Sequence, residues 1–542
     1  MLGLIALKRG RIEQAVHHLT QAATGDGGAA VACNLGTALA QAGRFAEAVS
    51  EFRRAITIAP DNADAHANLG AGLRALGRPA AAAAALTHAL ALAPEMADVR
   101  GNLAGALAEQ GRVGEALAEY RRAVAAAPAD ARLHSASLLA LHYDDGTNAD
   151  ALYAAHRTWA ARHAAGLGEA PQHRNRPEPE RRLRVGYVSA DLRTHSVAYF
   201  IAPLLTAHDR GRVEVTCYAD GVADATTARL RRTADRWRAV TELDDDGLVD
   251  LIRRDRIDIL VDLAGHTAGN RLAVFARRAA PVQVSYLGYP DTTGLAAIGH
   301  RITDPIADPP GAADGRHAEA LVRLPGGFLC YGPAADAPLP APPCDDAPVF
   351  GSFNALAKLS EATVALWARL LGAVPGARLV LKAAGLDEAE TKAHTVARFA
   401  AAGAAPERLT FLGRTPDSAD HLARYADIDV ALDPVAYAGT TTTCEALWMG
   451  VPVVTLAGDR HCRRVGASLL STAGLGDLVA ADENAYVAIA ARLAGDCERR
   501  TALRQGLRER LAKGPLTDAA AAARALEDAY REIWRRWCRG AG

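Results

Sequence analysis

The sequence predicts an α-solenoid followed by two α/β halves, each built around a parallel sheet. The first quarter of the 542-residue chain repeats itself every 34 residues. After residue 182, short apolar runs alternate with longer helical segments, which is the pattern of parallel sheets covered by helices on both faces. A single hydrophobic core rarely grows beyond roughly 250–300 residues, so a chain of this length is expected to divide into several domains.

The N-terminal repeat consists of units with the same landmarks. Each unit has an Asn-Leu-Gly or Asn-Leu-Ala opening and a closing proline, at Asn34, Asn68 and Asn102 and at Pro60, Pro94 and Pro128. This is the tetratricopeptide pattern, in which two helices per unit cross closely at small residues. We assign residues 1–130 to about four repeats. We expect the first repeat to be truncated, with further repeats upstream of Met1 or a start codon assigned too late.

Such an array presents a concave groove, which we expect to hold an extended peptide or another protein. The alternative is a spacer or a dimerisation stalk, which is compatible with a homo-oligomer. Residues 131–181 continue as a helical bridge that ends in a polar linker with prolines.

Two α/β halves follow the bridge. The first, at 182–335, has predicted strands at 183–189, 213–218 and 257–263 and a helix from about Ser196. The second, at 345–515, has predicted strands at 349–353, 378–382, 409–412, 428–432 and 451–455. The segment 516–542 is predicted to be an amphipathic helix that packs back across the halves. Two facing sheets of this kind leave a cleft at the carboxyl ends of their strands.

Composition excludes several classes of protein. The net charge is −1 and the pI is about 7.0, so no basic field attracts nucleic acid or an anionic membrane. The eight cysteines are scattered without CxxC spacing, which suits a reducing compartment and argues against structural zinc. No apolar run approaches the roughly 20 residues of a spanning helix, and the start lacks the order of a secretory signal. We expect a cytoplasmic protein that binds neither nucleic acid nor membrane.

The run 437–445, Tyr-Ala-Gly-Thr-Thr-Thr-Thr-Cys-Glu, is the most informative motif. It lies between an apolar run and a helical segment, so a glycine and hydroxyl side chains open a helix, among them Thr440, Thr441 and Thr442. Unpaired N–H groups at a helix N-terminus favour phosphate. Glu445, one turn further on, is placed to accept bonds from ribose hydroxyls. These features indicate a grip for the diphosphate and ribose of a nucleotide sugar. The alternative is an ordinary helix cap with surplus threonines.

Candidate residues in the first half follow its strands. His195 lies in the loop after the first strand, where it could bond an incoming sugar or accept a proton; alternatively it is an ordinary neighbour of a helix start. His266 and Thr267 follow another strand, between glycines that allow a ligand to approach closely. The loop that contains Leu287, Gly288 and Pro290 is rigid and could line the sugar pocket, although a plain turn would look the same.

Candidate residues in the second half also follow strands. Lys358, with Asn354 before it, could neutralise a departing diphosphate without a metal, unless it is a solvated helix lysine. His421 could pack its ring on the base of the nucleotide. Arg464 opens the last strong helix of this half and is either a donor-binding residue or a surface charge.

Motifs for metal or cofactor chemistry are missing from post-strand loops. The acidic run 244–246 lies in a polar turn before a helix, and we predict a helix cap there and not a metal-binding DxD pair. No GxGxxG or P-loop follows a strand, and no GxSxG nucleophile motif occurs. We therefore expect no metal and no cofactor, with the nucleotide sugar acting as a substrate.

With these motifs, the chain resembles the O-linked N-acetylglucosamine transferase / SPINDLY family of glycosyltransferases, and within it a bacterial SPINDLY-like member. The resemblance covers nearly the whole chain and includes the tetratricopeptide repeats and a split catalytic region. The matching segments are 184–196, 262–267, 280–290, 353–358 and 439–445. The resemblance implies a GT-B fold, that is, a double Rossmann-like catalytic region.

The resemblance also implies roles for individual residues. His195 is similar to the family's active-site histidine near the acceptor and sugar, and Lys358 to the lysine that grips the diphosphate and is needed for turnover. His421 is similar to the histidine on the base, and Glu445 to the acidic ribose ligand. The threonines at 440–442 correspond to the phosphate-binding turn.

Two positions depart from the animal O-linked N-acetylglucosamine transferases. Those enzymes carry glutamine where this chain has Ala355, and His-Thr-Thr where it has threonines at 440–442. The four-threonine form is closer to SPINDLY, whose plant member transfers fucose from GDP-fucose.

The sequence therefore predicts an inverting, metal-independent glycosyltransferase that modifies Ser or Thr hydroxyls of proteins recruited by the repeats. UDP-N-acetylglucosamine is the first candidate donor and GDP-fucose the second. The alternatives are transfer to asparagine and a tetratricopeptide scaffold with an inactive transferase half.

Overall fold

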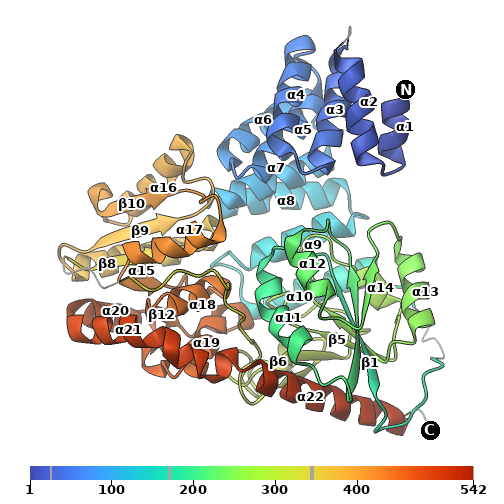
Figure 1. Ribbon diagram of the computed structural model, residues 1–542. Coiled ribbons are helices and arrows are strands. Elements are labelled where there is room, and N and C mark those ends of the chain that lie inside the picture. The colour runs from blue at the N-terminus through green and yellow to red at the C-terminus, as the bar shows by residue number, and fades with distance from the viewer. Residues whose placement is uncertain (25–26, 169–172, 342–346, 541–542) are drawn as a thin grey trace.

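A computed structural model describes residues 1–24, 27–168, 173–341 and 347–540. The predicted beginning of the second half at 345 lies outside the described residues, as do position 172 of the predicted linker and positions 541–542 of the last predicted helix. The predicted fold class is confirmed: a helical array precedes two parallel-sheet halves (Figure 1).

The helical array is a series of antiparallel pairs. Its helices are α1 (Leu2–Lys8), α2 (Ile12–Ala23), α3 (Ala29–Gln41), α4 (Phe45–Ile58), α5 (Ala63–Ala75), α6 (Pro79–Leu92), α7 (Ala97–Glu109), α8 (Val113–Ala126), α9 (Ala131–Leu141) and α10 (Ala149–His163). The glycine of the Asn-Leu-Gly opening sets how closely the helices of a pair approach. A Cβ on Gly36 would lie 2.5 Å from the ring of Phe52, and one on Gly70 would lie 2.4 Å from Leu86.

The first half contains a sheet of parallel strands in the order β3-β2-β1-β4-β5-β6-β7. The strands are β1 (Leu183–Ser189), β2 (Val213–Ala219), β3 (Arg236–Ala239), β4 (Ile259–Asp262), β5 (Val282–Ser285), β6 (His300–Thr303) and β7 (Ala320–Arg323). Its helices are α11 (Ser196–Ala207), α12 (Ala225–Arg231), α13 (Asp245–Asp255) and α14 (Leu272–Ala276). Asp244 caps α13 by accepting from the N–H of Gly247 at 2.8 Å, as predicted for the acidic run.

The second half repeats this topology, with the order β10-β9-β8-β11-β12-β13. The strands are β8 (Val349–Ser352), β9 (Arg378–Lys382), β10 (Leu409–Leu412), β11 (Val430–Leu432), β12 (Val453–Leu456) and β13 (Val479–Ala480). The helices are α15 (Glu361–Ala373), α16 (Ala389–Ala401), α17 (Ser418–Ala423), α18 (Thr441–Trp448), α19 (Val465–Thr472), α20 (Glu483–Gly495), α21 (Cys497–Ala512) and α22 (Ala519–Gly540). In both halves the strand order reverses after the first strand, and ligands bind at such switch points.

The terminal helix α22 crosses back from the second half and runs along the first (Figure 1). Its Trp534 is fully buried and donates through Nε1 to the carbonyl of Glu178 at 3.0 Å. Arg531 donates to the carbonyls of Pro179 and Arg181. The helix thus connects the end of the chain to the linker that precedes β1, as its amphipathic pattern predicted.

The repeats pack against the second half. Glu388, just before α16, accepts from the backbone N–H groups of Ala80 and Ala81 at 2.7 and 3.1 Å. These groups belong to the first turn of α6, where N–H groups have no partner within the helix. A side chain of the catalytic region therefore caps a helix of the repeats.

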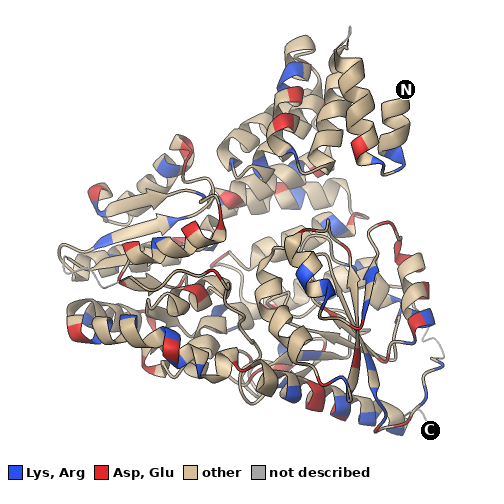
Figure 2. Cartoon of the chain, viewed as in Figure 1, with Lys and Arg blue, Asp and Glu red and all other residues tan. Residues whose placement is uncertain are grey.

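Positions of both charge signs occur throughout the molecule. In the view of Figure 2, blue and red positions are interspersed over the repeats and both halves. Within the part of the chain that the structure describes, no helix is both long and apolar enough to cross a bilayer.

Candidate functional site

The candidate site lies where β8 and β11 end, at the switch point of the second half. The short helix η2 (Leu356–Lys358) follows β8 and carries Lys358. The Lys358 ammonium donates to the carbonyl of Ala438 at 3.1 Å and approaches Oδ1 of Asn354 at 3.5 Å. It also lies 4.3 Å from the centre of the Tyr437 ring, a cation–π distance. The loops that follow β8 and β11, which are neighbours in the sheet, thus meet at the Lys358 ammonium.

The start of α18 closes this site from the other side. Thr440 is the N-cap of α18, and its side chain does not accept a bond from the first turn. Thr442 donates from Oγ1 to the same Oδ1 of Asn354, at 3.0 Å. Asn354 therefore connects Lys358 with the first turn of the helix. N–H groups of that turn, three hydroxyls and an ammonium form an arrangement whose chemistry suits a diphosphate.

Gly439 is required by the close packing of this turn. Its N–H donates to Oδ1 of Asp433 at 2.5 Å. A Cβ at this position would lie 2.6 Å from Oγ1 of Thr442 and 2.7 Å from Oγ1 of Thr443, distances at which an atom must move. The glycine thus allows the threonine side chains to fold back over the backbone.

Burial sets the ionisation of the two charged groups at the site. Burial lowers the pKa of Lys358 to about 8, and the attraction of Asp433 opposes this shift. Burial raises the pKa of Asp433 to about 6, against its bonds from Thr455 and Gly439 and the charge of Lys358. Because the protein offsets little of the positive charge of this buried ammonium, a negatively charged ligand would stabilise it strongly.

The predicted ribose ligand Glu445 is held in a polar cluster. Its Oε2 accepts from Nε2 of His421 at 3.1 Å and from the hydroxyl of Tyr425 at 3.3 Å. The other ring nitrogen of His421 lies 2.8 Å from Nζ of Lys382, so it accepts from the ammonium and His421 is the neutral Nε2–H tautomer. Oε1 of Glu445 has no partner among the described residues and is available to a ribose hydroxyl.

The sequence-based prediction did not include Lys382 and Tyr437, although two signals point to Lys382. Lys382 is the last residue of β9, and ligands bind beyond the carboxyl ends of parallel strands. Lys358 and Lys382 are two of only five lysines in a chain dominated by arginine. A lysine changes its pKa readily on burial, which arginine does not. Tyr437 is part of the predicted motif, but nothing in its spacing indicates that its ring lies beside Lys358.

His195 follows β1 and serves as the N-cap of α11. Its Nδ1 accepts from the N–H of Val197 at 3.3 Å and lies 3.7 Å from a carboxylate oxygen of Asp191. The side chain is 39% exposed, and burial of the remainder lowers its pKa, against the effect of Asp191. With Nδ1 accepting, the neutral ring carries its proton on Nε2. In this arrangement His195 offers a hydrogen-bond donor.

His266 is placed in the interior, which corrects its prediction as a pocket residue. It is 1% exposed, with Nδ1 3.0 Å from Oγ of Ser135 and Nε2 2.9 Å from the carbonyl of Thr293. Its ring packs edge-on against Trp159 at 4.6 Å. Nδ1 joins the first half to the bridge, and Nε2 bonds the loop 287–294 within the first half. The hydroxyl of Thr267 donates to the carbonyl of Ala264 at 2.8 Å.

The loop with Leu287, Gly288 and Pro290 is rigid and strained. Leu287 has a φ of 47°, which is uncommon outside glycine. A Cβ on Gly288 would lie 1.6 Å from the carbonyl oxygen of Leu263. Leu287 and Gly288 are partly exposed, whereas Pro290 is buried. The partly exposed turn therefore presents backbone rather than bulk to its surroundings.

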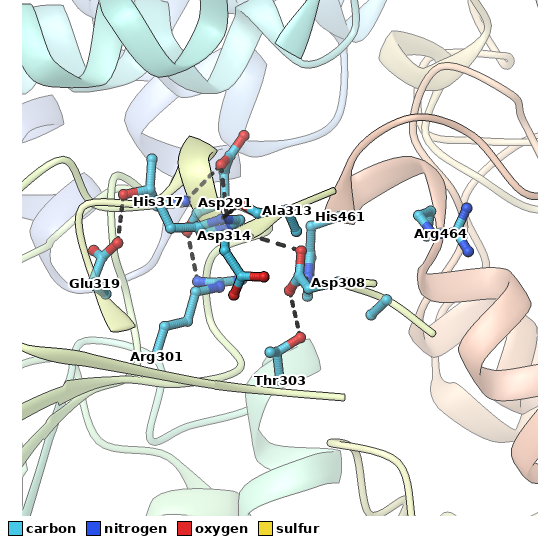
Figure 3. Close-up of polar contacts among 12 residues, drawn as sticks. Asp291, Arg301, Thr303, Asp308, Ala313, Asp314, His317, Glu319, His461 and Arg464 are labelled. Atoms are coloured by element: carbon cyan, nitrogen blue, oxygen red, sulfur yellow. Dashed lines mark hydrogen bonds and ion pairs between the residues drawn. The ribbon is translucent and has the colours of Figure 1, made fainter. Parts of the chain in front are cut away.

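Arg464 connects the two halves. Its guanidinium donates to the carbonyl of Ile306 at 2.7 Å and to that of Gly458 at 2.9 Å. Near it, buried His461 lies 2.7 Å from Oδ2 of Asp308, which also accepts from Thr303 (Figure 3). In this structure Arg464 therefore contacts protein carbonyls across the boundary between the halves.

The described residues contain no group of three or more His, Cys, Asp or Glu side chains placed to hold a metal ion.

The family model of glycosyl transferase family 41 matches residues 151–332 and 340–526. Two tetratricopeptide models match residues 1–63 and 73–141. A lysine-to-methionine variant of the Thermobaculum terrenum O-GlcNAc transferase has a similar structure, with a TM-score of 0.88 and 39% identity over 98% of this chain and 99% of that one.

Plant proteins named probable UDP-N-acetylglucosamine–peptide N-acetylglucosaminyltransferase SPINDLY are similar in sequence. The protein of Solanum lycopersicum is 45% identical over 412 residues, and that of Oryza sativa 44% over 417 residues. Each match covers 74% of this chain and 44% of the relative, so the chain spans a little under half the length of these relatives. The resemblance stated from the motifs is confirmed, and the chain belongs to glycosyl transferase family 41.

Proposed function

We propose that this protein transfers a sugar from a nucleoside diphosphate sugar to a Ser or Thr hydroxyl of a polypeptide bound by the repeats. The observation that carries the proposal is the convergence of Lys358, Asn354 and the first turn of α18. This arrangement places positive charge and free donors where a diphosphate leaving group gains charge, and such groups act most strongly in the transition state.

The donor is placed by residues of the second half. The first turn of α18 and Lys358 hold the diphosphate, Glu445 accepts from the ribose, and His421 and Tyr425 orient Glu445. His195, on the opposite side of the cleft, donates from Nε2 to the sugar or the acceptor. We propose inversion without a metal, because Lys358 and the helix start supply the charge stabilisation that a metal would give. UDP-N-acetylglucosamine is the first donor to test, because the plant relatives are named for it, and GDP-fucose is the second.

The repeats and the unpaired cysteines support the rest of the proposal. The groove of the array receives the acceptor polypeptide, and the cytoplasm is the proposed location, since all the cysteines that the structure describes are free thiols.

Calorimetric titration with UDP and with GDP in the presence of EDTA tests donor binding. We expect tight binding of one nucleotide. Mass analysis of a peptide pool incubated with the matching sugar nucleotide then gives the product, and alkaline β-elimination separates a Ser or Thr linkage from an Asn linkage. Binding of neither nucleotide would favour an inactive scaffold, and an alkali-stable product would favour transfer to asparagine.

Lys358→Ala is expected to lower kcat at least about 100-fold, as loss of a single charge-stabilising group does, while the melting temperature stays close to that of the wild type. Lys392→Ala, on α16 outside the site, is the matched control and is expected to retain activity. Steady-state donor turnover measures both. Near-normal turnover by Lys358→Ala would refute the role of this lysine.

A further inference from the structure

Residues at the end of α9 contact both α/β halves. His142 follows α9 directly, and its Nε2 lies 3.1 Å from the hydroxyl of Tyr289 in the loop 287–294 of the first half. The next residue, Tyr143, packs its ring 5.4 Å from that of Tyr437, which lies beside Lys358 in the second half. Two consecutive residues of the helical bridge therefore contact the proposed sugar loop of the first half and the tyrosine beside Lys358 in the second.

The backbone of the loop 287–294 is held by contacts within the first half, whereas the bridge reaches it at Tyr289. Backbone conformations like that of Leu287, with a φ of 47°, are unfavourable and persist only when the surroundings fix them. Arg301 donates to the carbonyls of Tyr289 and Asp291 at 2.9 and 2.6 Å. Glu319 accepts from the hydroxyl of Thr292 at 2.5 Å. Figure 3 shows Arg301 and Glu319 beside Asp291. These bonds hold the backbone of the loop from within the first half.

Tyr289 is the position at which the bridge contacts this loop. The residue is 2% exposed, and its hydroxyl lies 2.7 Å from Nε2 of His156 on α10 as well as near His142. Nδ1 of His156 lies 2.7 Å from the carbonyl of Leu152, so it carries the proton and Nε2 accepts from Tyr289. The tyrosine oxygen then accepts from Nε2–H of His142.

The assigned directions of these hydrogen bonds require neutral histidine rings, and burial of both rings favours the neutral form. Burial lowers the pKa of His142 to about 3 and lowers that of His156 as well, so both are neutral near pH 7. Nδ1 of His142 is buried without a partner among the described residues. It is the nitrogen left without a proton, and an acceptor is more readily left unpaired than a donor.

We propose that Tyr289 and Tyr143 are positioning residues. Through them the helical bridge holds the loop 287–294 of the first half in a fixed position relative to Tyr437 and Lys358 of the second half. The proposal rests on the proposed function. It assigns to the bridge a part in sugar transfer that is separate from holding the acceptor. Small displacements of reacting groups are costly, since an error of about 1 Å lowers rates by as much as 100-fold.

Tyr289→Phe removes both hydroxyl bonds and keeps the ring. In the full-length protein we expect kcat for hydrolysis of UDP-N-acetylglucosamine, or of GDP-fucose if that is the donor, to fall about tenfold or more. The Kd of the matching nucleotide, which contacts only the second half in the proposal, should stay within about twofold. Tyr218→Phe is the matched control, because its hydroxyl bonds Asp255 at 2.9 Å on the far side of the first half. It should change only the melting temperature.

Tyr143→Leu tests the other contact. Loss of the ring is expected to admit water beside Tyr437, so the pKa of Lys358 should rise and the alkaline limb of the kcat/KM profile should move to higher pH. Tyr143→Phe keeps the ring and should restore the wild-type profile. A purely structural role would lower stability without moving this limb.

The outcomes separate the two proposals. If the wild-type protein neither binds a nucleotide nor hydrolyses a donor, the proposed function fails. If the wild type is active and Tyr289→Phe keeps its kcat, or Tyr143→Leu keeps its pH profile, the corresponding positioning role is overturned and the proposed function stands.

Discussion

Lys358 illustrates how a single residue acquires its chemistry from burial. Its ammonium contacts a carbonyl, an amide oxygen and an aromatic face, none of which is a full negative charge. The nearest carboxylate that stabilises it electrostatically, Asp433, is bonded to Gly439 and Thr455. Burial therefore brings the pKa of this lysine down to about 8 in the free protein, and a bound diphosphate would raise it again.

This environment predicts the pH dependence of donor turnover. The protonated lysine is the active form, so kcat/KM, which reports the free protein, should be constant with respect to this group at neutral pH and fall as pH rises through about 8. The corresponding limb in kcat should lie at higher pH, because bound diphosphate favours the charged form. Any residual activity of Lys358→Arg should lack this limb, since a guanidinium stays charged. A wild-type profile that is flat to pH 10 would exclude Lys358 as the titrating group.

At the scale of single elements, the packing of the threonines at the start of α18 depends on Gly439, which has no side chain. Gly439→Ala should displace the side chains of Thr442 and Thr443, whose hydroxyls would lie within 2.7 Å of the new methyl group. We expect nucleotide affinity to fall about tenfold, the equivalent of one charge-assisted hydrogen bond, as measured by calorimetry. Gly372→Ala, near the end of α15 with open space around it, is the control and should stabilise by about 0.5–1 kcal/mol. Unchanged affinity in Gly439→Ala would show that the turn adapts.

The elements themselves were largely predictable, because their apolar runs are local. The strands at 183–189, 378–382 and 409–412 have the predicted bounds. The strand β3 was missed because its sequence, Arg-Trp-Arg-Ala, is polar and it lies at the edge of its sheet. The strand β7 is the other edge strand of this sheet, and its run of apolar residues, Ala-Leu-Val, is too short to stand out. An edge strand has fewer neighbours to bury it and so carries a weaker apolar signal.

The site was predictable to the extent that it follows strand ends. Asn354 and Lys358, which the structure brings together, were predicted in this way, and so was His195, which stays a prediction. The contacts of His266 and Tyr289 with the bridge were not, because they join segments more than 130 residues apart. Spacing along the chain gives no information about such a contact, which depends on how the bridge packs on the first half.

On the scale of the whole molecule, the repeats are fixed to the second half through Glu388. Glu388→Ala should remove the cap of α6, at a cost of about 1 kcal/mol, and loosen this junction. Hydrogen exchange should then be faster in the first turn of α6, while nucleotide affinity is retained. Glu390→Ala, at an exposed neighbouring position that does not cap α6, is the control. Unchanged exchange in Glu388→Ala would mean that the junction is held by other contacts, such as the packing of Gly385 on Pro79.

The arrangement of the array has a consequence for engineering. Only the later helices of the array lie against the catalytic halves, whereas Figure 1 shows α1–α4 standing clear of both sheets. Under the proposed function, we predict that these four helices can be exchanged as a module. Their outer residues can be redesigned, or replaced by repeats of another origin that end in the same packing surface toward α5, to recruit a chosen polypeptide while the transfer machinery stays untouched.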